Sequence, residues 1–369
     1  MKICFISPEM FHWGVHGGFG YLTWTLSREL VERGFKVSVV TPRRKGQASA
    51  EVVDGVKVYG YKTYEEHPYP LNAFLSRLDS VKCYRMADAD IYHSQAVSYN
   101  TYVAHRGMPE RKHILTFQDP YDRKEWQRIA RVIPKYGQIG HKLRVEAEIR
   151  FLRYVCNTMD EIYAQAYFLI EKARNLYGLR SDPSFLPNPV PIPENTMEKA
   201  GTPTVCFLAR WDPQKRVEIF FNLAINHPSI NFIAMGKSHD PAKDEELRNK
   251  YGSLPNLKLT GFVSEEEKSR ILGRSWALVN TSVREALPVS FLEALAHETP
   301  IISGENPDDL TTTYGHHVKD EDYSTGLKWL IESDEWMRKG RQGRDHVREV
   351  YEMDHVVDLH VEKYVKLGE

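Results

Sequence analysis

The chain has 369 residues, of which 41% are hydrophobic, 27% charged and 11% aromatic, and this is the composition of an ordinary globular protein. At roughly 150 residues per domain, the length predicts two domains or one large one. The 49 Lys and Arg residues nearly balance the 50 Asp and Glu residues, with a formal net charge of -1, which disfavours a nucleic-acid-binding protein. No apolar run approaches the roughly 18 residues that a transmembrane helix needs.

The cysteines are far apart and form no C-x-x-C pair: Cys4, Cys83, Cys156 and Cys206. A zinc site and a disulfide framework are therefore disfavoured, and the reducing cytoplasm is the predicted location. The apolar start of the chain is too short for a signal peptide and predicts a buried first strand at residues 3–7.

Short apolar segments alternate with segments of helical periodicity along the first half of the chain. A helical stripe over residues 19–30 ends at Gly34, and residues 37–41 predict the next strand. This strand–helix–strand order predicts a parallel sheet with helices on its faces. Residues 52–56 contain Asp-Gly, which predicts a tight hairpin. Further strands are predicted at residues 91–93, 114–117, 162–164 and 184–186.

The alternation stops at residues 187–193, where four prolines in seven positions exclude a helix or a central strand and predict a domain junction. The tail from Trp336 is predicted to be wholly helical. Between them, strands are predicted at residues 205–209, 232–235, 257–259, 277–280 and 301–303. The expected domains are residues 1–187, residues 188–340 and a helical tail, residues 341–369, that packs back across them.

In open α/β sheets, ligands bind beyond the carboxyl ends of the strands, so loops that follow strands are the informative ones. The first such loop contains His16, Gly17 and Gly18 just before a helix, where glycines let backbone N–H groups approach a phosphate. It is not a dinucleotide fingerprint, because Thr23 replaces the third glycine and Thr41 replaces the ribose-binding acid. A flexible turn is the alternative interpretation.

The second loop, residues 209–216, follows the first strand of the second predicted domain. Its Arg210 and Lys215 are placed to neutralise an anion such as a diphosphate leaving group. The alternative interpretation is a solvated basic loop.

The third loop carries Glu285 and leads into a helix that contains Glu293. Pro288 suits the first helical position, and the free N–H groups near Val289 and Ser290 can hold phosphate oxygens. One carboxylate can reach a sugar and the other can accept from the vicinal hydroxyls of a ribose. The alternative interpretation is a capping acid and a surface acid.

These three loops, in this order, resemble those of the family-4 retaining glycosyltransferases, which have the GT-B fold. Glu285 and Glu293 match the family's E-x7-E pair, and Arg210 and Lys215 match its Arg and Lys five apart. The resemblance spans nearly the whole chain. Three further segments are similar to the family's glycine loop, its Pro-Asn-Gly-Val junction and its Gly-x-Val segment near the nucleotide base: residues 17–18, 187–190 and 261–263.

The resemblance implies an α/β fold of two Rossmann-like domains whose parallel sheets face an interdomain cleft. It implies a retaining transferase that moves a sugar from a UDP- or GDP-sugar to an acceptor hydroxyl, with no required metal or cofactor. The acceptor is expected to be a sugar, a lipid-linked molecule or another small molecule. Two alternatives stay open, a nucleotide-sugar epimerase on the same fold and a sugar-nucleotide-binding protein without transfer activity.

Residue by residue, the resemblance and the loops together predict the site. The expected catalytic residues are Glu285, Arg210, Lys215 and Gln118. The expected donor-binding residues are Gly17, Gly18, Phe262, Val263, Ala286, Leu287, Pro288, Val289, Ser290 and Glu293. The expected acceptor-side residues are His16, His93, Gln95 and Asp119. A buried core histidine is the alternative interpretation of His93.

The sequence departs from the family at Gln118, where the family commonly has a His, and at Ala286, where it has Gly. A glutamine can donate to a sugar hydroxyl but cannot take a proton. The proton of the acceptor is therefore expected to go to the diphosphate itself.

The stretch of residues 122–153 carries nine Lys and Arg against four Asp and Glu. Contact with an anionic acceptor or with an acidic membrane surface is one interpretation, and a solvated helical face is the favoured one.

Overall fold

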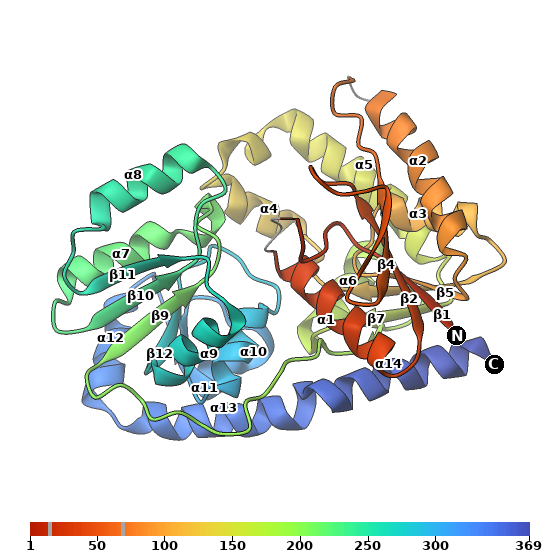
Figure 1. The fold of residues 1–369 in the computed structure, drawn as a ribbon. Coiled ribbons are helices and arrows are strands. Elements are labelled where there is room, and N and C mark those ends of the chain that lie inside the picture. The colour runs from red at the N-terminus through yellow and green to blue at the C-terminus, as the bar shows by residue number, and fades with distance from the viewer. Residues whose placement is uncertain (14–16, 68–70) are drawn as a thin grey trace. The chain divides into compact units, whose positions relative to one another are not determined.

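The computed structural model describes residues 1–13, 17–67 and 71–369, and the chain divides into two compact units (Figure 1). The first unit comprises residues 1–120, 143–189 and 354–369. The second unit comprises residues 121–142 and 190–353. The chain passes from the first unit to the second inside the proline-rich segment, after Pro189.

The first unit contains an eight-stranded sheet in the order β3-β4-β2-β1-β5-β6-β7-β8. All neighbouring strands are parallel except β3 and β4, which form the predicted hairpin around Asp54 and Gly55, both with positive φ. The predicted strands are confirmed. Their bounds are β1 (Lys2–Ile6), β2 (Lys36–Pro42), β3 (Ala50–Val53), β4 (Val56–Tyr61), β5 (Ile91–Ser94), β6 (Lys112–Phe117), β7 (Glu161–Ala164) and β8 (Ser184–Phe185).

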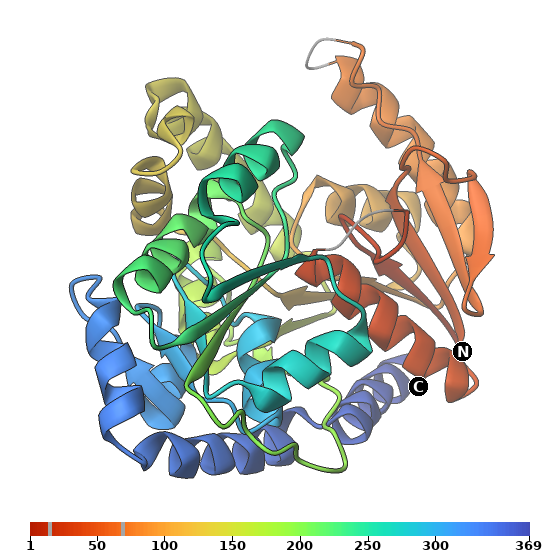
Figure 2. The same ribbon diagram turned by 60° about the vertical axis from the view of Figure 1, so that its left-hand side comes forward.

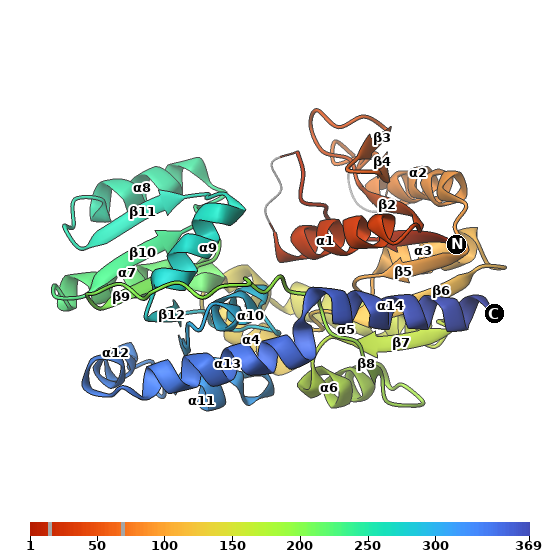
Figure 3. The same ribbon diagram turned by 60° about the horizontal axis from the view of Figure 1, so that its bottom comes forward.

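Helices of the first unit connect these strands, and the C-terminal helix runs along the unit (Figure 3). The two ends of the chain lie side by side (Figure 2), since a Cβ on Gly368 would come 2.7 Å from Met1 Cε. The helices are α1 (Gly18–Glu32), α2 (Leu71–Ala87), α3 (Tyr99–Gly107), most of α5 (Ile139–Cys156), α6 (Tyr167–Tyr177) and α14 (Met353–Gly368).

The second unit contains a six-stranded, wholly parallel sheet in the order β11-β10-β9-β12-β13-β14. The strand order reverses between β9 and β12, as in a doubly wound dinucleotide-binding sheet. The predicted strands are confirmed, and β14 is additional. Their bounds are β9 (Thr204–Leu208), β10 (Asn231–Met235), β11 (Leu257–Gly261), β12 (Ala277–Asn280), β13 (Ile301–Ser303) and β14 (Gly315–His317).

A large apolar core covers one face of the second sheet. Phe220 and Phe221 of α7 and Tyr251 of α8 pack with Phe207 and Phe232 of the sheet, all nearly inaccessible to water. On the other face, α9 and α10 contact β9 and β12. The helices are α4 (Arg123–Ala130), α7 (Val217–Asn226), α8 (Pro241–Tyr251), α9 (Glu265–Arg274), α10 (Val289–Ala296), α11 (Leu310–Tyr314), α12 (Tyr323–Glu332) and α13 (Glu335–Tyr351), with 3-10 turns at Pro134–Gly137, Pro213–Lys215 and Pro307–Asp309.

Two segments group differently from the domains expected from the sequence. Residues 121–142, expected in the first domain, belong to the second unit, because α4 makes ion pairs with the loops after β12 and β13. The tail expected at residues 341–369 is divided: residues 341–353 belong to the second unit, and residues 354–369 belong to the first, where Tyr364 contacts His93 of β5. Both groupings depend on contacts between residues far apart in the sequence.

Candidate functional site

The candidate site of the second unit lies where the strand order of its sheet reverses. The neighbouring strands β9 and β12 are followed by the loops 209–216 and 281–288. Ligands of open α/β sheets bind at this kind of position. The segments that follow β9 and β10 lie very close together. A Cβ on Gly236, which has φ +119°, would lie 2.0 Å from Ala209 O. Only a glycine permits this close approach of β9 and β10.

Glu285 is the centre of a compact hydrogen-bonded cluster. Its side chain is 7% exposed, and its Oε1 accepts from Lys215 Nζ at 2.6 Å, Ser282 Oγ at 2.6 Å and Asn280 Nδ2 at 3.0 Å. Burial raises the pKa of Glu285, but Lys215 and the hydrogen bonds outweigh burial and hold the pKa below its usual value. The carboxylate is therefore ionised and fixed in direction before any ligand arrives.

Hydrogen bonds also join the two loops to each other. Thr281 Oγ1 donates to Lys215 O at 2.7 Å, and Gln214 Nε2 donates to Arg284 O at 3.1 Å. Arg216 lies in the left-handed region, with φ 47°, and its Nε donates to Thr281 O at 2.8 Å. These contacts hold Lys215 beside Glu285.

Sequence reasoning missed four polar residues of this cluster: Gln214, Arg216, Asn280 and Ser282. Two of them could have been found from the sequence: Asn280 ends β12 and Ser282 follows it, and a polar residue at the carboxyl end of a buried strand is the signal.

Arg210 has different surroundings from Lys215. Its side chain is 44% exposed, and its recorded ion pair is with Asp212, at 3.2 Å. Of the two predicted cations, Lys215 therefore belongs to the Glu285 cluster. Arg210 lies in the same loop as Lys215 but is exposed to solvent.

Helix α10 begins at Val289, and Pro288 is its N-cap, so the expectation that Pro288 occupies the first helical position is one residue too early. Pro288 has φ -74° and ψ 134°, an extended conformation that precedes the helix. In the part of the chain that the structure describes, no side chain caps α10. Its first N–H groups, including that of Ser290, and the positive end of its dipole are thus available to an anion. Ala286 and Leu287 are buried, so only their backbone can contact a ligand.

Glu293 lies within α10 and is buried in an ion pair. Its Oε1 is 2.5 Å from Lys268 Nζ of α9, and Lys268 also pairs with Glu265. Burial raises the pKa of Glu293, and Lys268 offsets this only in part. Phe262 and Val263 follow β11, and Phe262 is 51% exposed.

In the first unit, the glycine loop precedes α1, with Gly17 as the N-cap. Glu9 already places a carboxylate there, because its Oε1 accepts from Gly20 N at 3.1 Å and lies 1.9 Å from where a Cβ of Gly17 would be. Among the described residues, no atom lies within 4 Å of where a Cβ of Gly18 would be. An anionic ligand at this helix end must therefore displace or repel the Glu9 side chain. His16 lies outside the described residues.

Gln118 belongs to a buried cluster of four amides at the carboxyl ends of β5, β6 and β7. Its Nε2 donates to Gln95 Oε1 at 3.0 Å and to Asn188 Oδ1 at 3.1 Å, and its Oε1 accepts from Asn188 Nδ2 at 2.8 Å. Gln165 donates to Gln118 O at 2.6 Å and accepts from Asn188. Both amide hydrogens of Gln118 are therefore engaged inside the unit, and a sugar hydroxyl would have to compete for them. Gln95 Nε2 is buried and finds no hydrogen-bond partner among the described residues. Asp119 follows Gln118 and is partly buried.

His93 is fully buried in the first unit. One ring nitrogen is 2.7 Å from Tyr364 Oη and the other is 2.7 Å from Thr116 Oγ1. Burial lowers the pKa of His93 well below its usual value, so the ring is neutral. These contacts match the core interpretation of His93 and leave neither nitrogen for an acceptor.

Among the described residues, no group of three or more His, Cys, Asp and Glu side chains is arranged to hold a metal ion. In the described part of the chain, no helix is both long and apolar enough to cross a bilayer.

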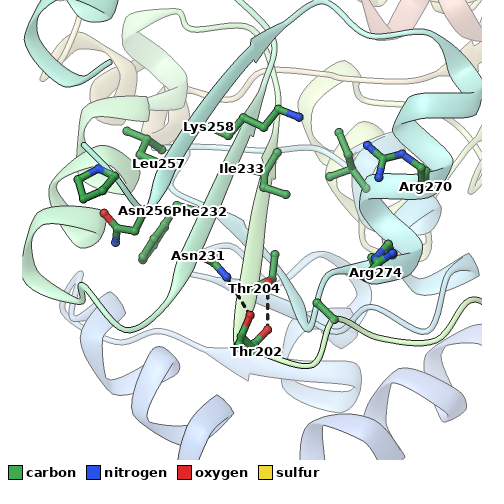
Figure 4. Close-up of a pocket in the computed structure, with 13 residues that line it drawn as sticks. Thr202, Thr204, Asn231, Phe232, Ile233, Asn256, Leu257, Lys258, Arg270 and Arg274 are labelled. Carbon is green, nitrogen blue, oxygen red and sulfur yellow. Dashed lines mark hydrogen bonds between the residues drawn. The ribbon is translucent and has the colours of Figure 1, made fainter. Parts of the chain in front are cut away.

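One pocket of the second unit lies near the amino ends of its strands, whereas Glu285 follows the carboxyl end of β12. It encloses about 370 Å³ near the amino ends of β9, β10 and β11, with Thr204, Asn231 and Leu257 in its lining. Lys258, Arg270 and Arg274 surround it (Figure 4). This pocket is separate from the loops that the sequence singles out.

Two family profiles match consecutive parts of the chain. The profile described as "Glycosyltransferase Family 4" matches residues 16–192, and that described as "Glycosyl transferases group 1" matches residues 192–330. A curated relative, "Glycosyltransferase 1 domain-containing protein 1" of Xenopus tropicalis, is 28% identical over 104 residues. The match covers 28% of this chain and 30% of that relative, so it spans under a third of the relative's length.

Solved structures of low identity share the fold over its whole length. Sucrose-phosphate synthase from Thermosynechococcus elongatus has a TM-score of 0.76 at 15% identity, with 99% of this chain and 98% of that chain covered. Anabaena HepE in complex with UDP-glucose has a TM-score of 0.71 at 12% identity, with 99% and 100% covered. The catalytic domain of starch synthase IV from Arabidopsis thaliana, bound to ADP and acarbose, has a TM-score of 0.64 at 12% identity, with 100% and 99% covered. The two family profiles together cover most of the chain, and both units contain a doubly wound, mainly parallel sheet. The chain therefore belongs to the glycosyltransferases of family-4 type and has the GT-B fold.

Proposed function

We propose that this protein is a retaining glycosyltransferase that moves a sugar from a UDP- or GDP-sugar to an acceptor hydroxyl. The observation that carries the proposal is the Lys215–Glu285 pair, a cation and an ionised carboxylate held 2.6 Å apart at the strand reversal of the second sheet. Family membership supports the reaction class. In this proposal the second unit binds the donor and the first unit binds the acceptor.

The leaving group is a nucleoside diphosphate, and its departure concentrates negative charge on the oxygen of the breaking sugar–phosphate bond. Lys215, Arg210 and the N–H groups at the start of α10 are the groups proposed to stabilise that charge. Because these are cations and dipoles of the protein itself, the reaction is proposed to need no metal ion.

Glu285 is proposed to contact the transferring sugar. Among the described residues, every hydrogen bond to the Glu285 carboxylate is accepted by Oε1. Oε2 is therefore the oxygen proposed to accept from a sugar hydroxyl. An ionised carboxylate near the sugar also stabilises the positive, oxocarbenium-like charge that develops as the bond breaks.

The acceptor hydroxyl is proposed to attack the same face of the sugar that the diphosphate leaves, which retains the anomeric configuration. Its proton is proposed to pass to the departing diphosphate oxygen. Glu293 is proposed to bind the ribose. Phe262 and Val263 are proposed to lie near the base. The strand ends of the first unit around Gln95, Gln118 and Asp119 are proposed to bind a sugar or lipid-linked acceptor.

A direct test uses the purified protein and a panel of UDP- and GDP-sugars. Nucleoside diphosphates that bind the folded state raise its unfolding midpoint, so a thermal-shift screen with UDP, GDP and ADP identifies the base. The matching sugar nucleotides are then assayed for hydrolysis and transfer, with Glu285→Gln as the control. NMR of the anomeric proton of the product reports retention. Binding of a sugar nucleotide without hydrolysis or transfer would contradict the proposal and favour a non-catalytic binding protein.

A further inference from the structure

Helix α4 contacts Val283 and Arg284, the two residues before Glu285, and is connected to Glu285 through a bridging residue. The guanidinium of Arg128 donates to Val283 O, and Glu125 Oε1 accepts from Arg284 Nε at 2.9 Å. The third residue, Glu285, is reached through Glu305. All of these residues belong to the second unit.

The connection to Glu285 passes through a bridging carboxylate. Glu305 Oε1 pairs with Arg128, and Glu305 Oε2 accepts from Glu285 N at 3.3 Å. Ser303 Oγ accepts from Glu305 N at 3.0 Å, which fixes the start of this loop after β13. Arg128 thus orients the carboxylate that holds the Glu285 peptide.

The Glu125–Arg284 pair is more deeply buried than the Arg128–Glu305 pair. The Arg284 side chain is 1% exposed, and its guanidinium lies 3.8 Å from the centre of the Tyr121 ring. The other oxygen of Glu125 accepts from Asp122 N at 2.9 Å, and this reciprocal capping box fixes the first turn of α4. A single carboxylate therefore caps α4 and anchors the residue next to Glu285.

Charge balance connects the two halves of the arrangement. Glu285 and Glu305 are neighbouring carboxylates, and each has its own cation, Lys215 and Arg128 respectively. Burial raises the pKa of Glu305, and Arg128 acts in the opposite direction. Without Arg128, Glu305 would be a buried carboxylate without a cation beside Glu285, so it would take up a proton or move away.

We propose that Arg128 and Glu125 are positioning residues of the transfer reaction, which hold the segment 283–285 so that Glu285 faces the donor sugar. The inference rests on the proposed function in assigning Glu285 to the sugar. It goes beyond that function by giving α4, whose Arg128 lies 155 residues before Val283 in the sequence, a role in the donor site. Small displacements of a catalytic group are costly: a shift of about 1 Å can lower the rate on the order of 10²-fold.

The first experiment compares the kinetics of Arg128→Met with those of Arg131→Met. Arg131 is an exposed arginine at the C-terminal end of the same helix and serves as the matched control. We expect Arg128→Met to lower kcat on the order of 10²-fold, with the Kd for UDP or GDP within about threefold of wild type, because the diphosphate contacts are not changed. Arg128→Lys keeps the charge but replaces the planar guanidinium with a compact ammonium of different reach and geometry, so its kcat should lie between those of wild type and Arg128→Met.

The rescue variant separates positioning from general loss of structure. In Arg128→Met/Glu305→Gln, the amide oxygen can still accept from Glu285 N, and the carboxylate left without a cation is gone. We expect this variant to recover roughly tenfold of the lost kcat, per folded molecule. Wild-type kcat in Arg128→Met, an equal loss in Arg131→Met, or no recovery in the double variant would overturn the proposal.

A second readout needs no activity. Native-state hydrogen exchange of the amides of residues 283–285 should be faster in Arg128→Met than in wild type and unchanged in Arg131→Met. Unchanged exchange in Arg128→Met would overturn the positioning role. If wild type binds a sugar nucleotide but never turns it over, the proposed function fails, and the exchange result still decides whether Arg128 holds this segment.

Discussion

Lys215 Nζ and Glu285 Oε1 are 2.6 Å apart, and this pair connects the loop after β9 to the loop after β12. Both side chains are largely buried, and Lys215 keeps the Glu285 carboxylate ionised against the effect of burial. A diphosphate that binds Lys215 would share this cation with Glu285. The pair therefore couples the leaving group to the carboxylate proposed to contact the sugar.

Replacing either predicted cation with alanine should lower turnover, but with different effects on stability. We expect Lys215→Ala and Arg210→Ala each to lower kcat roughly 10²-fold, the scale of a removed charge-stabilising group. Lys215→Ala should also lower the free energy of unfolding by about 3 kcal/mol, because it leaves Glu285 buried without its cation. Arg210→Ala should cost under about 1 kcal/mol, because its ion pair with Asp212 is exposed. Steady-state kinetics measure kcat, and urea unfolding measures the free energy of unfolding. Equal losses of stability in the two variants would contradict the placement of Lys215, but not Arg210, in the buried cluster.

Glu293→Gln should weaken nucleotide binding more than it lowers kcat. A ribose hydroxyl that donates to a carboxylate is bound before and during the reaction, so its loss appears mainly in binding. We expect the Kd for the matching nucleoside diphosphate to rise roughly tenfold or more, the scale of a hydrogen bond to a charged group. Calorimetric titration of the variant gives this value. An unchanged Kd would remove Glu293 from the ribose site and leave it a structural partner of Lys268.

The fold was predictable because its signals are local. Buried parallel strands such as β5 and β12 are short apolar runs, and the prolines around Pro189 interrupt them where the chain passes between the units. The strand β14 was not predicted, since its sequence Gly315–His317 carries no apolar run and it forms as an edge strand beside β13. Local pattern cannot identify an edge strand that is defined by its neighbour.

Site residues were predictable where they follow strands in a spaced motif, as Glu285 and Lys215 do. What could not be predicted is the set of partners that fix them. Arg128 lies 155 residues from Val283 in the sequence, and in isolation it belongs to a basic stretch that favours a solvated helix. The same limit applies to Gln118, whose amide partner Asn188 is 70 residues away.

Removal of metal ions should leave transfer unchanged. The proposed groups that neutralise the diphosphate are Lys215, Arg210 and the start of α10, and none of them requires a divalent cation. We therefore expect the same kcat after dialysis against EDTA as before. Activity that disappears with the chelator and returns with magnesium or manganese would contradict the proposal that protein cations replace the metal.

Buried histidines should make the first unit sensitive to mild acid. Burial lowers the pKa of His113 and of His360 to about 4, and it lowers the pKa of His93 well below its usual value. The unfolded chain binds protons below pH 6.5 while the folded unit does not, so stability is full above pH 6.5 and falls as the pH drops toward 4. Each such histidine contributes up to about 1.4 kcal/mol per pH unit in that window. Urea unfolding at pH 7.5 and pH 5 measures the fall, and equal stability at both would contradict the neutral, buried state.

Tyr364→Phe tests one contact of the same cluster without a change in charge. It removes the hydroxyl that lies 2.7 Å from His93 and leaves that ring nitrogen buried without its partner. We expect a loss of about 1–3 kcal/mol in the free energy of unfolding. Tyr154→Phe, at an exposed tyrosine of α5, is the control and should change the stability by less than about 0.5 kcal/mol.

Gln118→Ala tests whether the amide cluster supports the acceptor side of the reaction. The substitution removes the donor to Gln95 Oε1 and to Asn188 Oδ1, and both of these residues are buried. Leaving them without partners should lower the free energy of unfolding by about 1–3 kcal/mol. Because the cluster fixes the ends of β5, β6 and β7, transfer per folded molecule should fall, while the affinity for the nucleoside diphosphate should not change. Gln342→Ala, at an exposed glutamine of α13, is the matched control. Wild-type transfer in Gln118→Ala would remove Gln118 from the reaction, and wild-type stability would contradict the hydrogen-bonded cluster itself.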